Sequence, residues 1–208
     1  AGQALLAALA MLIVVEGGWV AVKVRTARQL DAANASPASL PAALPADYPR
    51  QQGPAPDFAL VNQDGSTIAL SRFRGRPVVV TFVFAHCQAL CPLIVQSLED
   101  GAAGADVLLV TLDPWRDTPS SLPAIARQWK TPPGFHVLSA RRPADVVRVI
   151  EAWGVPTERD DKTGDISHPG VVFLVDADGR LAYTFNNPSA AWVREALHRL
   201  RKSDRTLG

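Results

Sequence analysis

The chain has 208 residues, of which 48% are hydrophobic and 20% charged, and its formal net charge at pH 7 is +1. This is enough for one folded domain with appendages. No run of Lys and Arg forms a basic face, which argues against nucleic acid as a partner.

Sulfur-containing residues are scarce and restrict the kind of metal or disulfide chemistry. The two cysteines are too few for a disulfide scaffold or for a four-thiolate zinc site. Methionine occurs once, at Met11, which excludes a copper carrier built on clusters of thioethers.

The N-terminus carries a long apolar segment. Residues 4–22 are apolar except for Glu16, and about 20 such residues span a membrane as a helix. Trp19 near one end is typical of a membrane interface. We predict an uncleaved membrane anchor over residues 1–30.

Two observations oppose that prediction. A charged Glu16 costs about 2–3 kcal/mol at the bilayer centre. The basic residues follow the apolar segment, where the positive-inside rule favours the cytoplasm: Lys23, Arg25 and Arg28. The competing interpretation is a signal peptide with its apolar region at residues 4–15, although no small-x-small cleavage site follows Val15.

Residues 31–53 are rich in Ala and Pro and predict a semi-extended linker. We expect the globular domain to occupy residues 54–208. Its hydrophobic pattern alternates between strands and helices. We expect a hairpin of residues 58–61 and 67–70, strands at 77–84, 106–112, 135–138, 171–175 and 180–185, and helices at 92–98, 120–129, 143–153 and 189–200.

The two cysteines stand where the first long buried strand meets its helix, in the run Phe-Ala-His-Cys-Gln-Ala-Leu-Cys-Pro at residues 84–92. Positions i and i+4 share a face of a helix, so Cys87 and Cys91 can close on one soft metal ion or on each other. A purely structural disulfide would enclose so short a loop that it would stabilise the fold little. With this thiol pair, the α/β pattern predicts a thioredoxin-like sandwich.

Three segments resemble the SCO/SenC proteins, the membrane-tethered copper chaperones of cytochrome c oxidase. The Cys-x-x-x-Cys-Pro run resembles the copper-site motif of that family. Residues 110–119, Val-Thr-Leu-Asp-Pro-Trp-Arg-Asp-Thr-Pro, resemble its second signature, and residues 165–168 with 173–176 resemble the segment that carries its ligand histidine. The likeness runs in matching order from about residue 54 to about residue 200.

The chain departs from the family pattern in two places. Pro169 follows the histidine where the family usually has Ser or Thr, which stiffens this loop. The spacer between the cysteines, residues 88–90, is neutral where many relatives have an acidic or proline-containing spacer. Neither departure removes a ligand.

The resemblance implies a copper site made of Cys87, Cys91 and His168. Thiolates favour Cu(I) and imidazole suits either copper state. A helix N-terminus would favour the thiolate form of the cysteines. His86 is not expected to be a ligand, because neighbouring residues on a strand point to opposite faces. His136 and His198 lack a motif and are expected to be structural or exposed.

The same resemblance implies a metallochaperone rather than an enzyme. It would deliver copper to the dinuclear copper site of oxidase subunit II, receive copper from an upstream donor and depend on a thiol reductant. Its domain would lie on the periplasmic or an equivalent extracytoplasmic side of the membrane.

Three rival functions remain. A thiol-disulfide oxidoreductase would use Cys87 and Cys91 as a redox disulfide to reduce the cysteines of the oxidase copper site, but its usual spacing is Cys-x-x-Cys and it does not need His168. A structural zinc site would need a fourth ligand. A peroxidase would need a peroxidatic cysteine with Arg and Thr around it, a pattern that the cysteine pair does not supply.

Asp113, Arg116 and Asp117 have two interpretations. They form a loop-capping network before a helix that starts at Thr118 and Pro119, or they support the copper site and a docking surface. We favour the first, because Asp and Thr are common at helix starts. Trp115 in the same loop is a candidate for contact with a partner.

Overall fold

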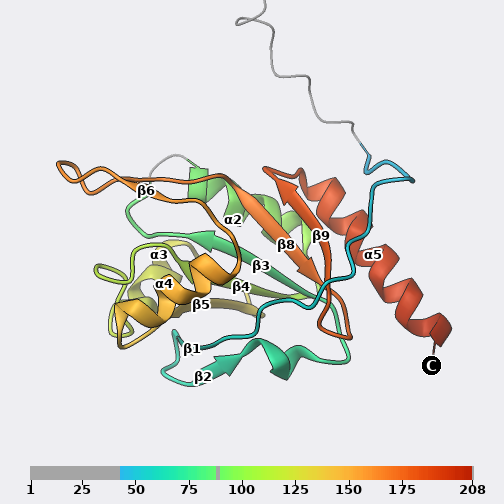
Figure 1. Ribbon diagram of the computed structural model, residues 1–208, viewed down its shortest axis with the longest axis horizontal. Helices are drawn as coiled ribbons and strands as arrows, with labels where there is room; N and C mark the ends of the chain where they lie inside the picture. Colours follow the sequence, from blue (N-terminus) through green and yellow to red (C-terminus); the bar gives the residue numbers. More distant parts are fainter. Residues whose placement is uncertain (1–42, 88–89, 208) are drawn as a thin grey trace, which may run out of the picture. The chain divides into compact units, whose positions relative to one another are not determined.

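The computed structural model describes residues 43–87 and 90–207, and its main feature there is a seven-stranded sheet of order β2-β1-β5-β4-β3-β8-β9 (Figure 1). The strands β3, β4 and β5 are parallel, and β8 pairs antiparallel with β3. The bounds are β1 Ala59–Asn62, β2 Thr67–Ala69, β3 Val78–Val83, β4 Asp106–Thr111, β5 Phe135–Ser139, β8 Val171–Val175 and β9 Leu181–Asn186.

Helices cover both faces of this sheet. They are α2 Leu90–Gly101, α3 Leu122–Gln128, α4 Pro143–Ala152 and α5 Ala190–Leu207, with a 3₁₀ turn η1 at Leu70–Phe73. Right-handed crossovers from β3 to β4 and from β4 to β5 place α2 and α3 on one face, where α2 also packs against α5. The helix α4 lies on the opposite face (Figure 1). The predicted α/β sandwich is confirmed.

The core is built on β3, whose six residues are all buried. An uninterrupted apolar strand of this kind is typical of a sheet covered on both faces. On the α4 side, the Trp153 ring packs edge-on against Phe173 at 4.9 Å and lies 6.0 Å from Phe82. These contacts hold the strands whose ends carry the thiol and histidine loops.

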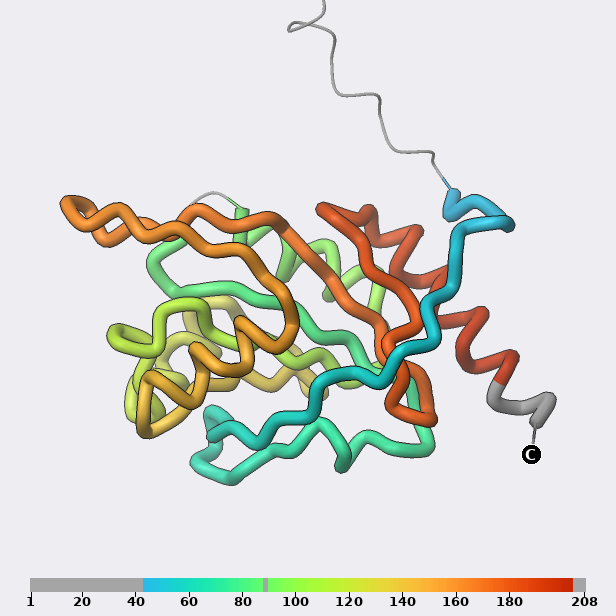
Figure 2. The backbone as a smooth tube through the Cα atoms, viewed as in Figure 1, coloured from blue at the N-terminus to red at the C-terminus, as the bar shows by residue number. Residues whose placement is uncertain are grey.

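Residues 43–53, expected to belong to the linker, lie against β9 and α5 (Figure 2). The backbone amide of Gln51 donates to Ala182 O at 2.8 Å. The Tyr48 ring packs against Phe185 and Trp192, with centroid distances of 5.2 and 5.5 Å. Leu44 is buried as well. Folded contacts of the domain therefore begin before residue 54.

One element was not expected, a hairpin of β6 Glu158–Arg159 and β7 Ile166–Ser167. Its strands have two residues each, so no alternating pattern reveals them. The helix α2 also begins at Leu90 rather than Pro92, because proline is tolerated in a first turn.

The predicted membrane anchor lies outside the described residues. Within residues 43–87 and 90–207, no helix is both long enough and apolar enough to cross a membrane.

Candidate metal centre

The sheet topology brings the thiol pair and His168 to one edge. The strands β3 and β8 run antiparallel with Thr81 opposite Val172, so the chain leaving β3 and the chain entering β8 meet at the same end. Cys87 lies beyond that end of β3, and His168 lies three residues before β8. Residues distant in sequence are thereby placed side by side.

The three predicted ligands form a compact group. The Sγ atoms of Cys87 and Cys91 and a ring nitrogen of His168 all lie within 4.8 Å of one another. Cys91 Sγ is 3.6 Å from His168 Nε2. The Cys91 amide donates to Cys87 Sγ at 3.2 Å. His86 is exposed and does not belong to the group. Among the described residues the group offers three donors, one fewer than a structural zinc site needs.

His168 has a defined tautomer. Its Nδ1 lies 3.0 Å from Pro169 O, and because a carbonyl oxygen only accepts, Nδ1 carries the hydrogen. The lone pair of Nε2 then faces the thiols, as a metal ligand requires. The ring packs edge-on against Phe84, and burial lowers the pKa of His168, although the bond to Pro169 opposes this. The imidazole is thus held in its neutral, ligating form.

The two thiols differ in their surroundings. Cys91 is fully buried in the first turn of α2, whereas Cys87 is half-buried in the loop before it. Burial, followed by the hydrogen bond with Cys87, raises the pKa of the Cys91 thiol far above its usual range. Without metal, desolvation therefore opposes the thiolate form of Cys91 that the helix N-terminus was expected to favour. Metal binding has to displace this proton.

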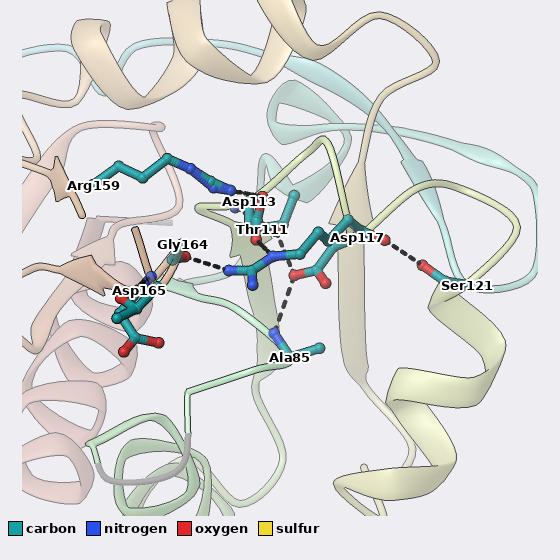
Figure 3. A network of polar contacts seen from close by, with 10 residues as sticks. Ala85, Thr111, Asp113, Asp117, Ser121, Arg159, Gly164 and Asp165 are labelled. Carbon is teal, nitrogen blue, oxygen red and sulfur yellow. Dashed lines mark hydrogen bonds and ion pairs between the residues drawn. The ribbon is translucent and has the colours of Figure 1, made fainter. Parts of the chain in front are cut away.

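A buried carboxylate holds the start of the thiol loop (Figure 3). Asp117 Oδ2 accepts hydrogen bonds from the Ala85 amide at 3.0 Å and from the Thr111 hydroxyl at 2.7 Å. Burial raises the pKa of Asp117, while these two bonds lower it. The contact to Ala85 ties the residues just before Cys87 to the end of β4.

A second buried carboxylate, Asp113, holds the β6–β7 hairpin that precedes His168. It is ion-paired with Arg116 and with Arg159, the latter at 2.8 Å. Arg116 also donates to Gly164 O at the tip of the hairpin (Figure 3).

Asp113, Arg116 and Asp117 do form a polar network within their loop, but the helix start expected at Thr118 and Pro119 is wrong. The helix α3 begins only at Leu122, and its N-cap residue Ser121 makes no capping bond through its side chain. The sequence interpretation also missed Thr111 and Arg159. The signal for Arg159 is indirect, since a buried aspartate needs a cation from somewhere in the fold.

The remaining residues with expected roles lie outside the group. His136 Nε2 lies 3.2 Å from Asp106 Oδ1 at the other end of the parallel strands, and His198 is exposed on α5. Trp115 is 56% exposed, and the Arg159 guanidinium lies 5.3 Å from its ring centre.

The model of the family described as SCO1/SenC matches residues 46–202. The chain belongs to the SCO1/SenC family. The solved structure of Bradyrhizobium japonicum ScoI with copper bound is similar, with a TM-score of 0.58 and 24% identity over 71% of this chain and 99% of that one. This likeness confirms the thioredoxin-like fold, and the donor set of this SCO1/SenC protein, two sulfurs and one imidazole, is suited to copper.

Two curated relatives show how far the likeness extends along the chain. The SCO2-like protein of Rickettsia prowazekii is 27% identical over 135 residues, 59% of this chain and 64% of that protein. The chloroplastic peroxiredoxin Q of Populus jackii is 33% identical over 138 residues, 64% of this chain and 58% of that protein. The chain therefore spans less than two thirds of the length of either relative.

Proposed function

We propose that this SCO1/SenC protein is a copper metallochaperone that holds copper through Cys87, Cys91 and His168. The observation that carries the proposal is the convergence of their three donor atoms within 4.8 Å. The hydrogen bond from Nδ1 to Pro169 supports it, because it leaves Nε2 available to a metal.

The arrangement suits a cargo that must be both held and released. Two thiolates and one imidazole bind copper strongly but leave its coordination sphere open to a further ligand. Because Cys87 is more exposed than Cys91, an incoming ligand of the acceptor reaches the copper from the Cys87 side. We propose the dinuclear copper site of oxidase subunit II as the acceptor.

Copper titration of the reduced full-length chain tests the proposal. Wild type is expected to bind one copper ion, and Cys87→Ser and His168→Ala are each expected to weaken binding at least tenfold, the scale seen when support for a metal ligand is lost. His198→Ala is the matched control, because His198 is exposed and does not belong to the group. Copper binding that is unchanged in both site variants would contradict the proposal.

A second candidate function is a thiol-disulfide oxidoreductase that reduces the cysteines of the oxidase copper site. It is supported by the adjacency of the two thiols, where the Cys91 amide contacts Cys87 Sγ, and by the similarity to peroxiredoxin Q. In this reaction the Cys87–Cys91 dithiol would give up two electrons and two protons to a partner disulfide.

The variant His168→Ala separates the two functions. A metallochaperone should lose copper retention, whereas an oxidoreductase should keep its rate of thiol-disulfide exchange with a dithiol-disulfide probe. Weak copper binding that is unchanged in His168→Ala, together with fast thiol-disulfide exchange, would favour the oxidoreductase.

The proposed context is a membrane-anchored protein. Residues 1–30 would anchor it, the following residues up to 42 would link the anchor to the domain, whose folded contacts begin by Leu44, and the domain would lie on the extracytoplasmic side. Protease digestion of intact cells with a permeable outer barrier tests this arrangement, since only a domain on the outer side of the membrane is then digested.

A further inference from the structure

The hairpin that leads into His168 has little stability of its own. It consists of two strands of two residues, which pair with each other and, among the described residues, with no strand of the main sheet. A two-stranded ribbon is marginal in water even when it is longer. The orientation of His168 therefore depends on what fastens the hairpin to the domain.

The fastening is an ion pair to a buried carboxylate. Asp113 is 0% exposed, and its two oxygens are used separately: Oδ1 accepts from Arg159 at 2.8 Å and Oδ2 accepts from Arg116. A carboxylate that is wholly removed from water requires such partners, so both guanidinium groups are drawn to this point. Because Arg159 belongs to β6, its ion pair fixes the position of that strand.

The path from Arg159 to the imidazole is short. Arg159 pairs with Ile166 of β7, whose side chain is buried, and His168 lies two residues further along the chain. Arg116 fastens the other end of the hairpin through Gly164 O.

The same turn also holds the thiol loop. The Asp117 amide donates to Asp113 O at 2.8 Å, and the Asp117 side chain accepts from the Ala85 amide at 3.0 Å (Figure 3). Thr111 bridges the pair, since its hydroxyl accepts from the Asp113 amide and donates to Asp117. One turn thus sets both halves of the metal centre.

We infer that Arg159 is a positioning residue for the metal centre: by its ion pair with Asp113 it fixes the β6–β7 hairpin and so holds His168 against the thiol pair. The inference rests on the proposed copper function for its affinity arm only. Arg159 itself is not among the clustered donors, and it acts through His168.

The first arm of the test uses the reduced, metal-free full-length chain. The rings of Phe84 and His168 have centroids 5.7 Å apart, which predicts a nuclear Overhauser effect between them. This effect should be present in wild type and lost in Arg159→Ala. Its absence from wild type, or its persistence in Arg159→Ala, would overturn the inference whether or not the protein binds copper.

The second arm is a double-mutant cycle on the dissociation constant for Cu(II). Arg159→Ala should weaken binding about tenfold in the wild-type background. Arg159→Ala should have no further effect on copper affinity in the His168→Ala background, because the ligand that Arg159 positions is already absent there. An equal loss in both backgrounds would show a general structural effect and overturn the inference.

Two variants complete the design. Arg159→Lys keeps a cation for Asp113 and should restore most of the affinity, whereas Arg142→Ala removes an exposed ion pair on α4 and should change nothing. If Arg159→Ala is unfolded at 25 °C, Arg159→Met, which keeps an unbranched side chain but cannot pair with Asp113, takes its place in both arms.

Discussion

At the residue scale, burial decides the protonation of the candidate ligands. The imidazole of His168 is kept neutral, and Cys91 is kept as a thiol, although both groups must act as Lewis bases toward copper. The ring is thus ready to bind, while the buried thiol has to lose its proton when the metal arrives. Uptake of copper should therefore release protons.

The raised pKa of Cys91 also predicts how stability depends on pH. The folded state holds the thiol proton more tightly than the unfolded chain, so the stabilisation is complete below the unfolded value of 9.0 and is lost as pH rises above it. For one group, the free energy of unfolding should fall by about 1 kcal/mol between pH 9 and pH 10. Urea unfolding of the reduced, metal-free protein measures this fall.

The control for that experiment is Cys91→Ala, which removes the titrating group. The difference between the two pH profiles isolates Cys91 from other groups that titrate in the same range. Parallel profiles for wild type and Cys91→Ala would show that Cys91 ionises normally in the folded protein.

At the element scale, the position of α2 depends on its close approach to α5. Gly101 at the end of α2 faces the start of α5, and a Cβ atom there would lie 2.7 Å from Ala190 O and 3.0 Å from Val193 Cβ. A backbone oxygen cannot move aside as a side chain can. The two helices therefore pack at a distance that only glycine permits.

Gly101→Ala should accordingly force α2 and α5 apart. Overpacking of this kind costs about 1–3 kcal/mol of the free energy of unfolding. Urea unfolding measures it, with Gly53→Ala as the control, because a Cβ at Gly53 meets nothing within 4 Å. Equal stability of the two variants would mean that the helices already have room.

The hairpin and the loops illustrate a different use of secondary structure. The sheet and α2 are held by apolar burial, whereas β6 and β7 contribute one buried apolar side chain, Ile166, and are also held by charged groups that converge on Asp113. An element fastened by a few polar contacts opens more readily than one fastened by a core. A hairpin of this kind suits His168, a ligand that has to release copper to an acceptor.

At the scale of the whole molecule, the metal centre joins distant parts of the chain. Cys87 and Cys91 follow β3, His168 precedes β8, and β3 and β8 are adjacent in the sheet. Copper bound to all three residues would cross-link these segments in the folded state only.

Copper should therefore stabilise the folded protein. At a free copper concentration 100 times the dissociation constant, the gain is about 2.7 kcal/mol, which corresponds to a rise of about 5–10 °C in the melting temperature of a domain of this size. Calorimetry of the reduced protein with and without copper measures the shift. His168→Ala should show a much smaller one, and an equal shift in that variant would place the copper elsewhere.

Much of the fold was predictable because its signals are local. The apolar run of β3 predicted a strand buried on both faces, and the Asp-Ala-Asp-Gly sequence before β9 predicted a tight turn. The thiol pair was recognisable from its spacing and its place after a buried strand. His168 was recognisable only through the resemblance to a family, since a single histidine has no distinguishing pattern.

The sequence by itself determined the α/β class, the thiol pair at the strand–helix junction and the order of the three motifs, because each follows from residues close together in the chain. Only the tertiary structure decided that Arg159 pairs with Asp113, that Asp117 holds the Ala85 amide rather than a helix start, and that residues 44–53 pack on β9 and α5. These contacts join segments far apart in sequence. Their partners are selected by burial and by the antiparallel pairing of β3 with β8, neither of which leaves a local pattern.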